Sequence, residues 1–345
     1  MAGYSTKYGR FICGDSLNVL DTLEDNSINL IVTSPPFSNQ RKKKYSNFDE
    51  VPQDEYVNWL LQFAEKAYSK LAPDGSFVID IRSAYEKGKA VESIYPYDFL
   101  IRMVKDLNYR LCQTVWWNNT SALPLPIQYV NIEKIRLKSS LNMNMWFTKA
   151  PDGRCKADNR KVLVPYSARM QKLIEQPESF FKEDLTVRPS GSILSKKSWQ
   201  KDNGGAIASN LLSYPNCSSN DSYQRFCKKL NIKPHPARFP YKLIKFWVNF
   251  LTDEDDLVVD IFGGSNTTGK VAEDLKRHWL CIDLSQEYAA SSVFRFCDDV
   301  EQAKDYYDRI ISGENVTVQE MEKMCHVIRN EKEAGEDYQP NGWVF

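Results

Sequence analysis

Residues 258–269 read VVDIFGGSNTTG and combine the end of an apolar strand, a glycine turn and the start of a helix. Glycine lets the backbone turn sharply and approach a ligand without a Cβ in the way. The turn lacks the Gly-Lys-Ser/Thr ending of a phosphate loop and the Gly-x-Gly-x-x-Gly spacing of a dinucleotide fingerprint. Asp260 ends this strand as an acceptor that suits an amine, and Asp283 ends the next strand, where a carboxylate can hold ribose hydroxyls. An amine and a ribose without a phosphate loop indicate S-adenosylmethionine; the alternative is a tight turn, capped by Asp260, in an unrelated sheet.

Strand-like and helix-like segments alternate on both sides of this turn. Apolar residues share one helical face over 54–71, a helix is expected over 267–276, and strands are expected over 29–33 and 76–80. Such alternation predicts an α/β layered sheet. From 150 to about 231 the periodicity is poor and Gly, Pro, Ser, Asn and Lys dominate, which indicates an inserted module.

The chain has a globular composition, since 42% of its 345 residues are hydrophobic and 26% are charged. No stretch approaches the ~18 apolar residues of a membrane span, and the N-terminus lacks the apolar segment of a secretory signal. The 8 cysteines are scattered without a Cys-x-x-Cys pair. We therefore expect a cytoplasmic protein with reduced thiols and no metal site.

The formal net charge is zero, but the charges are unevenly distributed. Residues 298–345 contain 12 acidic and 5 basic residues, a net charge of −7, so the remainder of the chain carries +7. Basic runs occur at 41–44, 196–197 and 228–229. Charge runs are usually solvated surface, so this distribution permits nucleic-acid binding without demonstrating it.

A second unusual stretch, Thr33-Ser-Pro-Pro-Phe37, follows an apolar strand. Proline lacks an N–H donor, so Pro35 and Pro36 leave carbonyl acceptors beside the hydroxyl of Ser34. Acceptors suit both N–H bonds of an exocyclic amine, and holding them can direct the lone pair of that nitrogen toward a methyl donor. Phe37 offers a face for stacking on a base, which would first have to leave its duplex. The alternative is an ordinary Pro-Pro loop with a core phenylalanine.

Together the two stretches resemble the motif pair of the amino-methylating DNA methyltransferases, through Ser34-Pro-Pro-Phe37 and Asp260-x-Phe262-x-Gly264-Ser265. The proline motif comes first, as in the circularly permuted beta group. Two further stretches, 235–240 (HPARFP) and 14–16 (GDS), resemble the other cofactor motifs of that group. Over 11–297 the chain resembles the PvuII-type cytosine-N4 methyltransferases, with shared stretches at 40–43, 73–77, 188–191 and 201–205.

This resemblance implies a Rossmann-like, S-adenosylmethionine-dependent methyltransferase sheet that is mixed and mostly parallel, with a circularly permuted motif order. It assigns residues 1–149 and 232–297 to a catalytic and cofactor-binding domain and 150–231 to a target-recognition module. Residues 298–345 remain as an acidic helical extension. That extension could be a clamp, a dimer surface or a solubilising tail.

The resemblance also implies roles for single residues. The catalytic corner consists of Ser34, Pro35, Pro36, Phe37 and Asp80, in which Ser34 and the carbonyl of Pro35 hold the amine and Phe37 stacks on the base. Asp80 ends a strand expected beside the one that carries Ser34, so it either pairs with the serine hydroxyl or merely caps a turn.

The cofactor residues form a second set. The methionine half is assigned to Phe239, Asp260, Phe262, Gly263, Gly264 and Ser265, the ribose to Asp283, and the adenine amine to Asp15 with its neighbour Ser16. We expect Asn266 to cap the helix after the turn. For His235 a structural hydrogen bond is favoured over catalysis.

Duplex DNA is the expected partner, and the resemblance implies N4 methylation of a flipped cytosine within a restriction-modification system, at a CAGCTG-like site. The side chains expected to contact DNA are Arg41, Lys42, Lys43, Lys44, Arg188, Ser190, Lys196, Lys197 and Lys201. Arg, Lys and Ser side chains are common donors to phosphates and base edges.

Other functions fit the sequence less well. Methylation of carbon 5 of cytosine needs a cysteine nucleophile at the proline corner, and no cysteine follows either proline. Adenine-N6 methylation stays open because its target is also an exocyclic amine, although those enzymes more often begin the tetrapeptide with aspartate and end it with tyrosine. A non-catalytic DNA-binding module is a more remote alternative, since both motifs are intact.

Overall fold

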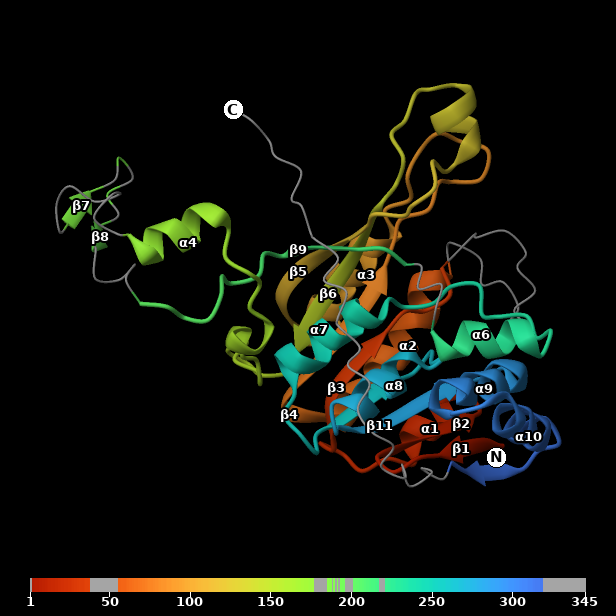
Figure 1. Cartoon of the computed structure of the whole chain (residues 1–345). Coiled ribbons are helices and arrows are strands. Elements are labelled where there is room, and N and C mark those ends of the chain that lie inside the picture. The colour runs from red at the N-terminus through yellow and green to blue at the C-terminus, as the bar shows by residue number, and fades with distance from the viewer. Residues whose placement is uncertain are drawn as a thin grey trace.

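The computed structural model describes residues 2–37, 55–176, 185–187, 193–195, 201–216 and 221–318, together with Pro189 and Gly191. Its central feature is a sheet of 10 strands in the order β12-β1-β2-β11-β10-β3-β4-β6-β5-β9 (Figure 1). In chain order these strands are β1 (Gly3–Ser5), β2 (Gly9–Cys13), β3 (Ile28–Thr33), β4 (Leu71–Ile81), β5 (Arg110–Asn119), β6 (Leu141–Thr148), β9 (Leu211–Tyr214), β10 (Leu257–Asp260), β11 (His278–Asp283) and β12 (Asn315–Thr317).

The middle of the sheet is parallel. Strands β2, β11, β10, β3 and β4 run in one direction, whereas β6 runs antiparallel to both β4 and β5. Parallel strands end at the same edge of a sheet, where open α/β sheets bind their ligands. The observed sheet confirms the predicted mixed, mostly parallel architecture, and it brings the ends of β3, β4, β10 and β11 together.

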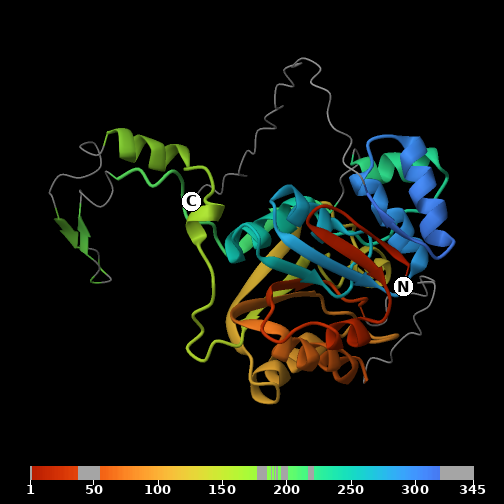
Figure 2. The same ribbon diagram turned by 90° about the horizontal axis from the view of Figure 1, so that it is seen from below.

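Helices cover both faces of the sheet (Figure 2). Helices α1 (Ser16–Asp21), α2 (Tyr56–Lys70) and α3 (Tyr95–Lys105) pack into one apolar cluster. The opposite cluster contains side chains of α6 (Ser222–Lys229), α7 (Tyr241–Leu251), α8 (Thr267–Asp274), α9 (Gln286–Ser292) and α10 (Val300–Ile311). The sheet between two buried layers explains why its central strands are almost continuously apolar.

The helix predicted over 54–71 is α2, and its predicted apolar stripe is buried, including Val57, Leu60 and Leu61. The strand predicted over 76–80 lies within β4, which begins earlier, at Leu71. Ile28 pairs with Leu71 and Leu30 with Ser76, so residues 72–75 bulge out of the ladder without ending the strand.

The predicted module 150–231 is not separate from the main body throughout. Strand β9 pairs with β5 at the edge of the central sheet, and Tyr223 and Phe226 of α6 belong to its apolar core. What extends away from the sheet in Figures 1 and 2 is α4 (Ala168–Glu175) and the antiparallel hairpin of β7 (Leu185–Val187) and β8 (Ile193–Ser195). The assignment of target recognition to this region stays a prediction.

The first part of the C-terminal extension is built into the fold. Helix α10 contributes Ala303, Tyr306 and Ile310 to the buried core, and β12 pairs in parallel with β1. Residues 300–318 therefore complete one edge of the sheet, whereas 319–345 lie outside the described residues.

Within the described part of the chain, no helix is long and apolar enough to cross a membrane. The 6 described cysteines carry free thiols, and no group of His, Cys, Asp or Glu among the described residues could hold a metal ion. The predicted cytoplasmic location stays a prediction.

Candidate active site

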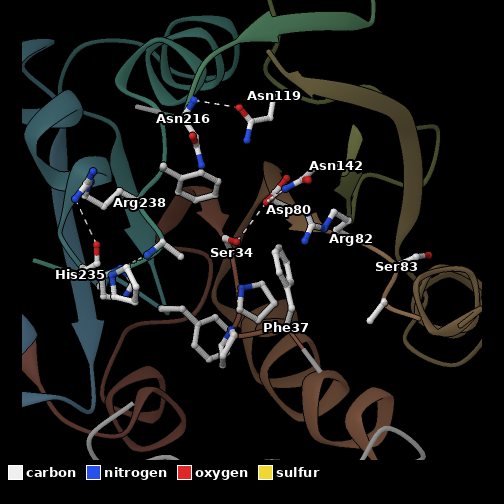
Figure 3. A pocket seen from close by; sticks show the side chains of 18 of the residues that line it. Ser34, Phe37, Asp80, Arg82, Ser83, Asn119, Asn142, Asn216, His235 and Arg238 are labelled. Atoms are coloured by element: carbon white, nitrogen blue, oxygen red, sulfur yellow. Dashed lines mark hydrogen bonds between the residues drawn. The ribbon is translucent and has the colours of Figure 1, made fainter. Parts of the chain in front are cut away.

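A cavity of about 1350 Å³ lies where the four strand ends meet. The proline corner after β3 lines it together with the glycine turn after β10 and with Asp80 and Asp283. Figure 3 shows Ser34 and Asp80 pointing toward one another, with Phe37 beside them and His235 and Arg238 across the view. The two stretches that are far apart in sequence therefore border one continuous space.

Asp80 is the centre of a buried hydrogen-bond network. Its Oδ2 accepts from the Ser34 hydroxyl at 3.3 Å and from Asn142 Nδ2 at 2.9 Å, and its Oδ1 accepts from Asn144 Nδ2 at 2.7 Å. The indole N–H of Trp247 donates to Asn144 Oδ1 at 3.1 Å, which fixes the amide group with its nitrogen toward Asp80. Donors surround the carboxylate, so the network stabilises its ionised form.

Burial raises the pKa of Asp80 to about 6, although the hydrogen bonds from Asn142, Ser34 and Asn144 lower it. The carboxylate is therefore ionised at neutral pH and accepts the proton of Ser34. A serine that donates its own hydrogen keeps its oxygen lone pairs for another donor, such as an amine. This geometry favours the predicted pairing with Ser34 over the alternative of a turn cap.

Methyl transfer should decrease as the pH falls through about 6, because a protonated Asp80 would donate to Ser34 and occupy a serine lone pair. The measurement is kcat between about pH 5 and 8 at saturating S-adenosylmethionine. Burial also raises the pKa of Asp283 to about 6, but its protonation should increase the KM for the cofactor instead. A kcat that stays constant from neutral pH to about pH 5 would contradict this role of Asp80.

Folding stability depends on pH in the opposite direction to activity. Both carboxyl groups have a pKa raised above the ordinary value of 3.8, so their contribution to folding stability is fully present below that pH and is lost as the pH rises through about 6. Ionised Asp80 and Asp283 at neutral pH therefore cost folding free energy, as is common for groups held in place for function.

The two proline carbonyls are not equivalent. The Tyr56 hydroxyl donates to the carbonyl of Pro36 at 3.0 Å, so this oxygen helps to attach the corner to α2. No hydrogen bond to the carbonyl of Pro35 occurs among the described residues. The structure thus leaves Ser34 Oγ and the Pro35 oxygen as the pair of acceptors for an amine, with Pro36 in a supporting position.

Asp260 is 1% exposed and holds three parts of the fold together. Its carboxylate accepts from the hydroxyls of Thr33 and Thr268, both at 2.6 Å, and from the backbone N–H of Phe262 at 3.1 Å. Burial raises its pKa, and these three donors lower it. These contacts are the ones expected if Asp260 caps the turn, which was the alternative interpretation. Contact of Asp260 with the cofactor amine stays a prediction.

Asp283 faces the same turn from the next strand. Its Oδ2 accepts from the backbone N–H of Gly264 at 2.8 Å, and its Oδ1 accepts from that of Ser285 at 2.9 Å. The side chain is half-buried and lines the cavity. Each oxygen keeps a further lone pair, so the donor set fits two neighbouring hydroxyls of a ribose.

The glycine turn is shaped for close approach. Gly264 has a φ of +49°, and a Cβ there would lie 3.2 Å from His235 Nε2. The next residue but one, Asn266, caps α8 by accepting from Gly269 N at 2.8 Å, as predicted. A left-handed glycine without a side chain leaves the cavity open to a ligand at this turn.

Ser265 is held from behind by the buried side chain of Arg295. The guanidinium donates to the carbonyl and the hydroxyl of Ser265 at 2.5 and 3.1 Å, and it pairs with Asp221 at 3.3 Å. Arg295 lies in the short helix 293–296, and the sequence analysis did not single it out. It positions the predicted cofactor turn.

Replacing Arg295 with methionine should destabilise the protein by about 3 kcal/mol or more, because Asp221 and the Ser265 carbonyl lose a buried cationic partner. The cofactor affinity should also fall, by about ten-fold. Thermal unfolding with and without S-adenosylmethionine measures both effects. The matched substitution Arg309→Met removes an exposed arginine of α10, and a similar effect there would contradict the positioning role of Arg295.

The predicted adenine-side residues lie at the start of α1. The exposed Asp15 caps this helix by accepting from Leu17 N at 2.9 Å, and the Ser16 hydroxyl donates to the carbonyl of Ile261 at 2.6 Å. Phe262 packs on Trp59 and Phe63, with ring centroids 5.6 and 4.9 Å apart. Ser16 thus attaches α1 to the glycine turn, while Asp15 and Phe262 border the cavity.

His235 and Phe239 line the cavity from the segment that precedes α7. The backbone N–H of His235 donates to the Tyr223 hydroxyl at 2.7 Å, and its Nδ1 accepts from Ala237 N at 3.3 Å. The imidazole packs edge-on against Tyr288, with centroids 4.4 Å apart. These contacts support a structural role for His235, and Phe239 lines the cavity as expected.

Most of the residues that are predicted to contact DNA lie outside the described part of the chain. They are Arg41, Lys42, Lys43, Lys44, Arg188, Ser190, Lys196 and Lys197. Lys201 is described and exposed, at the start of the segment that returns to β9. Their roles stay predictions.

Four side chains that support the catalytic corner were not predicted: Tyr56, Asn142, Asn144 and Trp247. A signal existed for the two asparagines, because they alternate with Met143 in a strand that is otherwise apolar. Polar residues two apart on one strand share a face, so they indicate a buried polar partner on the neighbouring strand.

A family model described as DNA methylase matches residues 28–294. The chain belongs to this DNA methylase family. The Type II methyltransferase M.PvuII of Proteus hauseri is 49% identical over 316 residues, which cover 91% of this chain and 92% of the relative. M.BglII of Bacillus subtilis is 25% identical over 276 residues, which cover 80% of this chain and 65% of that relative. The solved structure of PvuII DNA methyltransferase (cytosine-N4-specific) matches with a TM-score of 0.75 and 41% identity, covering 93% of this chain and 98% of that one.

These similarities confirm the predicted methyltransferase fold, the predicted class of DNA methyltransferase and S-adenosylmethionine as the cofactor. As a DNA methylase the protein acts on DNA. The roles of its individual site residues stay predictions that the geometry of the cavity supports.

Proposed function

We propose that this DNA methylase transfers a methyl group to the N4 amino group of a cytosine that has rotated out of duplex DNA. The observation that supports this proposal most strongly is the pair of acceptors at the proline corner. They are Ser34 Oγ and the Pro35 carbonyl, and they lie beside the ionised Asp80. Relationship to M.PvuII, at 49% identity over nearly the whole of both chains, supports cytosine N4 as the target atom.

The residues of the cavity fit S-adenosylmethionine. Asp283 offers two carboxylate oxygens to the ribose, and the side-chain-free Gly264 leaves room where a Cβ would meet His235. When bound, S-adenosylmethionine supplies an electrophilic methyl group on a sulfonium. The chain has to place an amine nitrogen in line with that methyl group.

The proline corner performs this placement. The amine donates one hydrogen to Ser34 Oγ and the other to the Pro35 carbonyl, which directs the nitrogen lone pair away from the ring plane. Phe37 stacks on the base and excludes water. As the new N–C bond forms, the nitrogen becomes acidic, and one proton leaves along Ser34 toward Asp80, whose pKa of about 6 allows it to accept.

A base paired in a duplex cannot reach this corner, because Asp80 is 2% exposed and Ser34 lies only partly exposed beside it. The target therefore rotates out of the helix before transfer. The predicted recognition of a CAGCTG-like site and a partner endonuclease that cuts the same site belong to this proposal, and they rest on the relationship to M.PvuII.

The test is incubation of the purified protein with labelled S-adenosylmethionine and long duplex DNA, followed by nucleoside analysis and mapping of the modified positions. N4-methylcytosine at CAGCTG, together with protection against an endonuclease that cuts CAGCTG, is the expected result. N6-methyladenine would replace the proposal with the adenine alternative. No label on any DNA would contradict it altogether.

A further inference from the structure

Residues 120–140, between β5 and β6, form an arm that projects from the sheet (Figure 1). Its base is closed by the hydrogen bond from Asn119 N to the Ser140 carbonyl at 2.8 Å. Its interior is fixed by hydrogen bonds from Asn131 Nδ2 to the Pro124 carbonyl and from Gln128 Nε2 to Glu133 Oε1, both at 2.7 Å. These hydrogen bonds give the arm a defined structure of its own.

A neighbouring loop supports the arm. Arg136 donates to the carbonyl of Ala90 at 2.7 Å, and the rings of Tyr85 and Tyr129 pack with centroids 5.4 Å apart. Both contacts join the arm to the segment that follows β4, the strand of Asp80. The orientation of the arm is thus coupled to the wall of the catalytic corner.

The arm exposes large apolar side chains at an unusual density. Leu137 is 89% exposed and Leu123 is 69% exposed, and four further residues are exposed: Leu125, Ile127, Ile132 and Ile135. A cluster of this kind indicates an interaction surface, because single apolar residues are common on surfaces but clusters are not. The hydrogen bond from Lys138 Nζ to the Ala122 carbonyl, at 3.5 Å, joins the two sides of the arm at residues adjacent in sequence to Leu137 and Leu123.

The position of the cluster points to DNA as the partner. Leu123, Leu125 and Ile127 line the same cavity as Ser34 and Phe37, so a base held at the catalytic corner leaves its duplex beside the arm. The charge of the arm agrees with this. Residues 120–140 contain three basic residues, Lys134, Arg136 and Lys138, and a single acidic residue, Glu133. DNA is therefore the occupant that we consider, because the cluster borders the cavity proposed to hold the target base.

We propose that the arm is a DNA-contacting element that inserts Leu123 and Leu137 into the duplex at the position the target base leaves. Apolar wedges between base steps are a known way to stabilise an opened stack. Lys134 and Lys138 contact the phosphates on either side of the opening. The inference rests on the proposed rotation of the target base, and it assigns the stabilisation of the opened duplex to residues outside the predicted recognition module.

The test compares two duplexes that contain the mapped methylation site. In one the target base is paired, and in the other it faces an abasic position, so that rotation needs no pair to be broken. The variant Leu123→Ser/Leu137→Ser should lower kcat/KM by about ten-fold or more on the paired duplex and by less than about three-fold on the other. The matched control is Ile311→Ser, which removes an exposed apolar residue of α10 and should leave both values unchanged.

Both leucines are exposed, so the thermal unfolding temperature and the affinity for S-adenosylmethionine should not change in the double serine variant. Equal losses on the two duplexes, or no loss on either, would overturn the wedge, and the second result would leave the apolar cluster to a protein partner. Lys134→Ala/Lys138→Ala should weaken binding to both duplexes equally and reduce the salt dependence. A wild-type protein that methylates no DNA would contradict the proposed function and the wedge together, whereas wild-type activity with an unaffected variant contradicts the wedge alone.

Discussion

Asp80→Asn should lower kcat by about 10³-fold with little change in the affinity for S-adenosylmethionine. The carboxylate accepts from Ser34, Asn142 and Asn144, and an asparagine amide would place its own N–H₂ against one of these donors. Ser34 would then lose the acceptor that frees its lone pairs, and the departing proton would lose its destination. Losses of 10² to 10⁴ are typical when a positioned acceptor or a general base is removed.

Single-turnover methyl transfer and isothermal titration with S-adenosylmethionine measure the two quantities separately. Ser34→Ala should have a similar effect, and the double variant should be hardly worse than either single one, because the two side chains act as a unit. The exposed Asp74→Asn, on the bulge of the same strand, is the matched control. If Asp80→Asn retained more than about a tenth of the activity, Ser34 would have to act without its carboxylate.

The second large effect is expected at the glycine turn. Gly264→Val should weaken S-adenosylmethionine binding by about 100-fold or more, since Gly264 has a φ of +49°, donates its N–H to Asp283 and has His235 3.2 Å from the site of a Cβ. A side chain there strains the turn, at about 1–2 kcal/mol for the left-handed backbone alone, and enters the space predicted for the cofactor.

Gly153 provides the matched control for this substitution. It has a φ of +74° and nothing within 4 Å of a built Cβ, so Gly153→Val carries the backbone strain without touching the cavity. Both variants should unfold at a lower temperature, but only Gly264→Val should lose cofactor affinity in calorimetric titration. Equal cofactor affinity in the two variants would place the cofactor elsewhere than against this turn.

The arrangement of Asp80 illustrates how the fold supports function. Strand pairing brings Asn144 opposite Asp80, and α7 brings Trp247 against Asn144 from the apolar layer behind the sheet. The indole N–H orients the amide, and the amide holds the carboxylate as an acceptor. A buried carboxylate that costs folding free energy at neutral pH is thus kept in its ionised form by side chains from three elements.

The sequence by itself determined the chemistry of the two edges of the site. Proline residues and a serine after an apolar strand, and a glycine turn between two carboxylates, are local patterns, and local patterns decide which atoms a backbone corner can offer. The stripe of α2 and the cap at Asn266 were likewise local and appear as predicted. The family resemblance then connected the two edges, and the comparisons confirmed it.

Only the tertiary structure decided which of those atoms remain available. Tyr56 donates to the Pro36 carbonyl, Thr33 donates to Asp260, and Arg295 donates to Ser265. Each of these donors is 20 or more residues away from its acceptor along the chain. Strand β9, which lies within the predicted module, is likewise recognised as a strand of the main sheet only once β5 lies beside it. Hydrogen bonds between elements depend on strand order and register, and neither can be predicted from the spacing of residues along one segment.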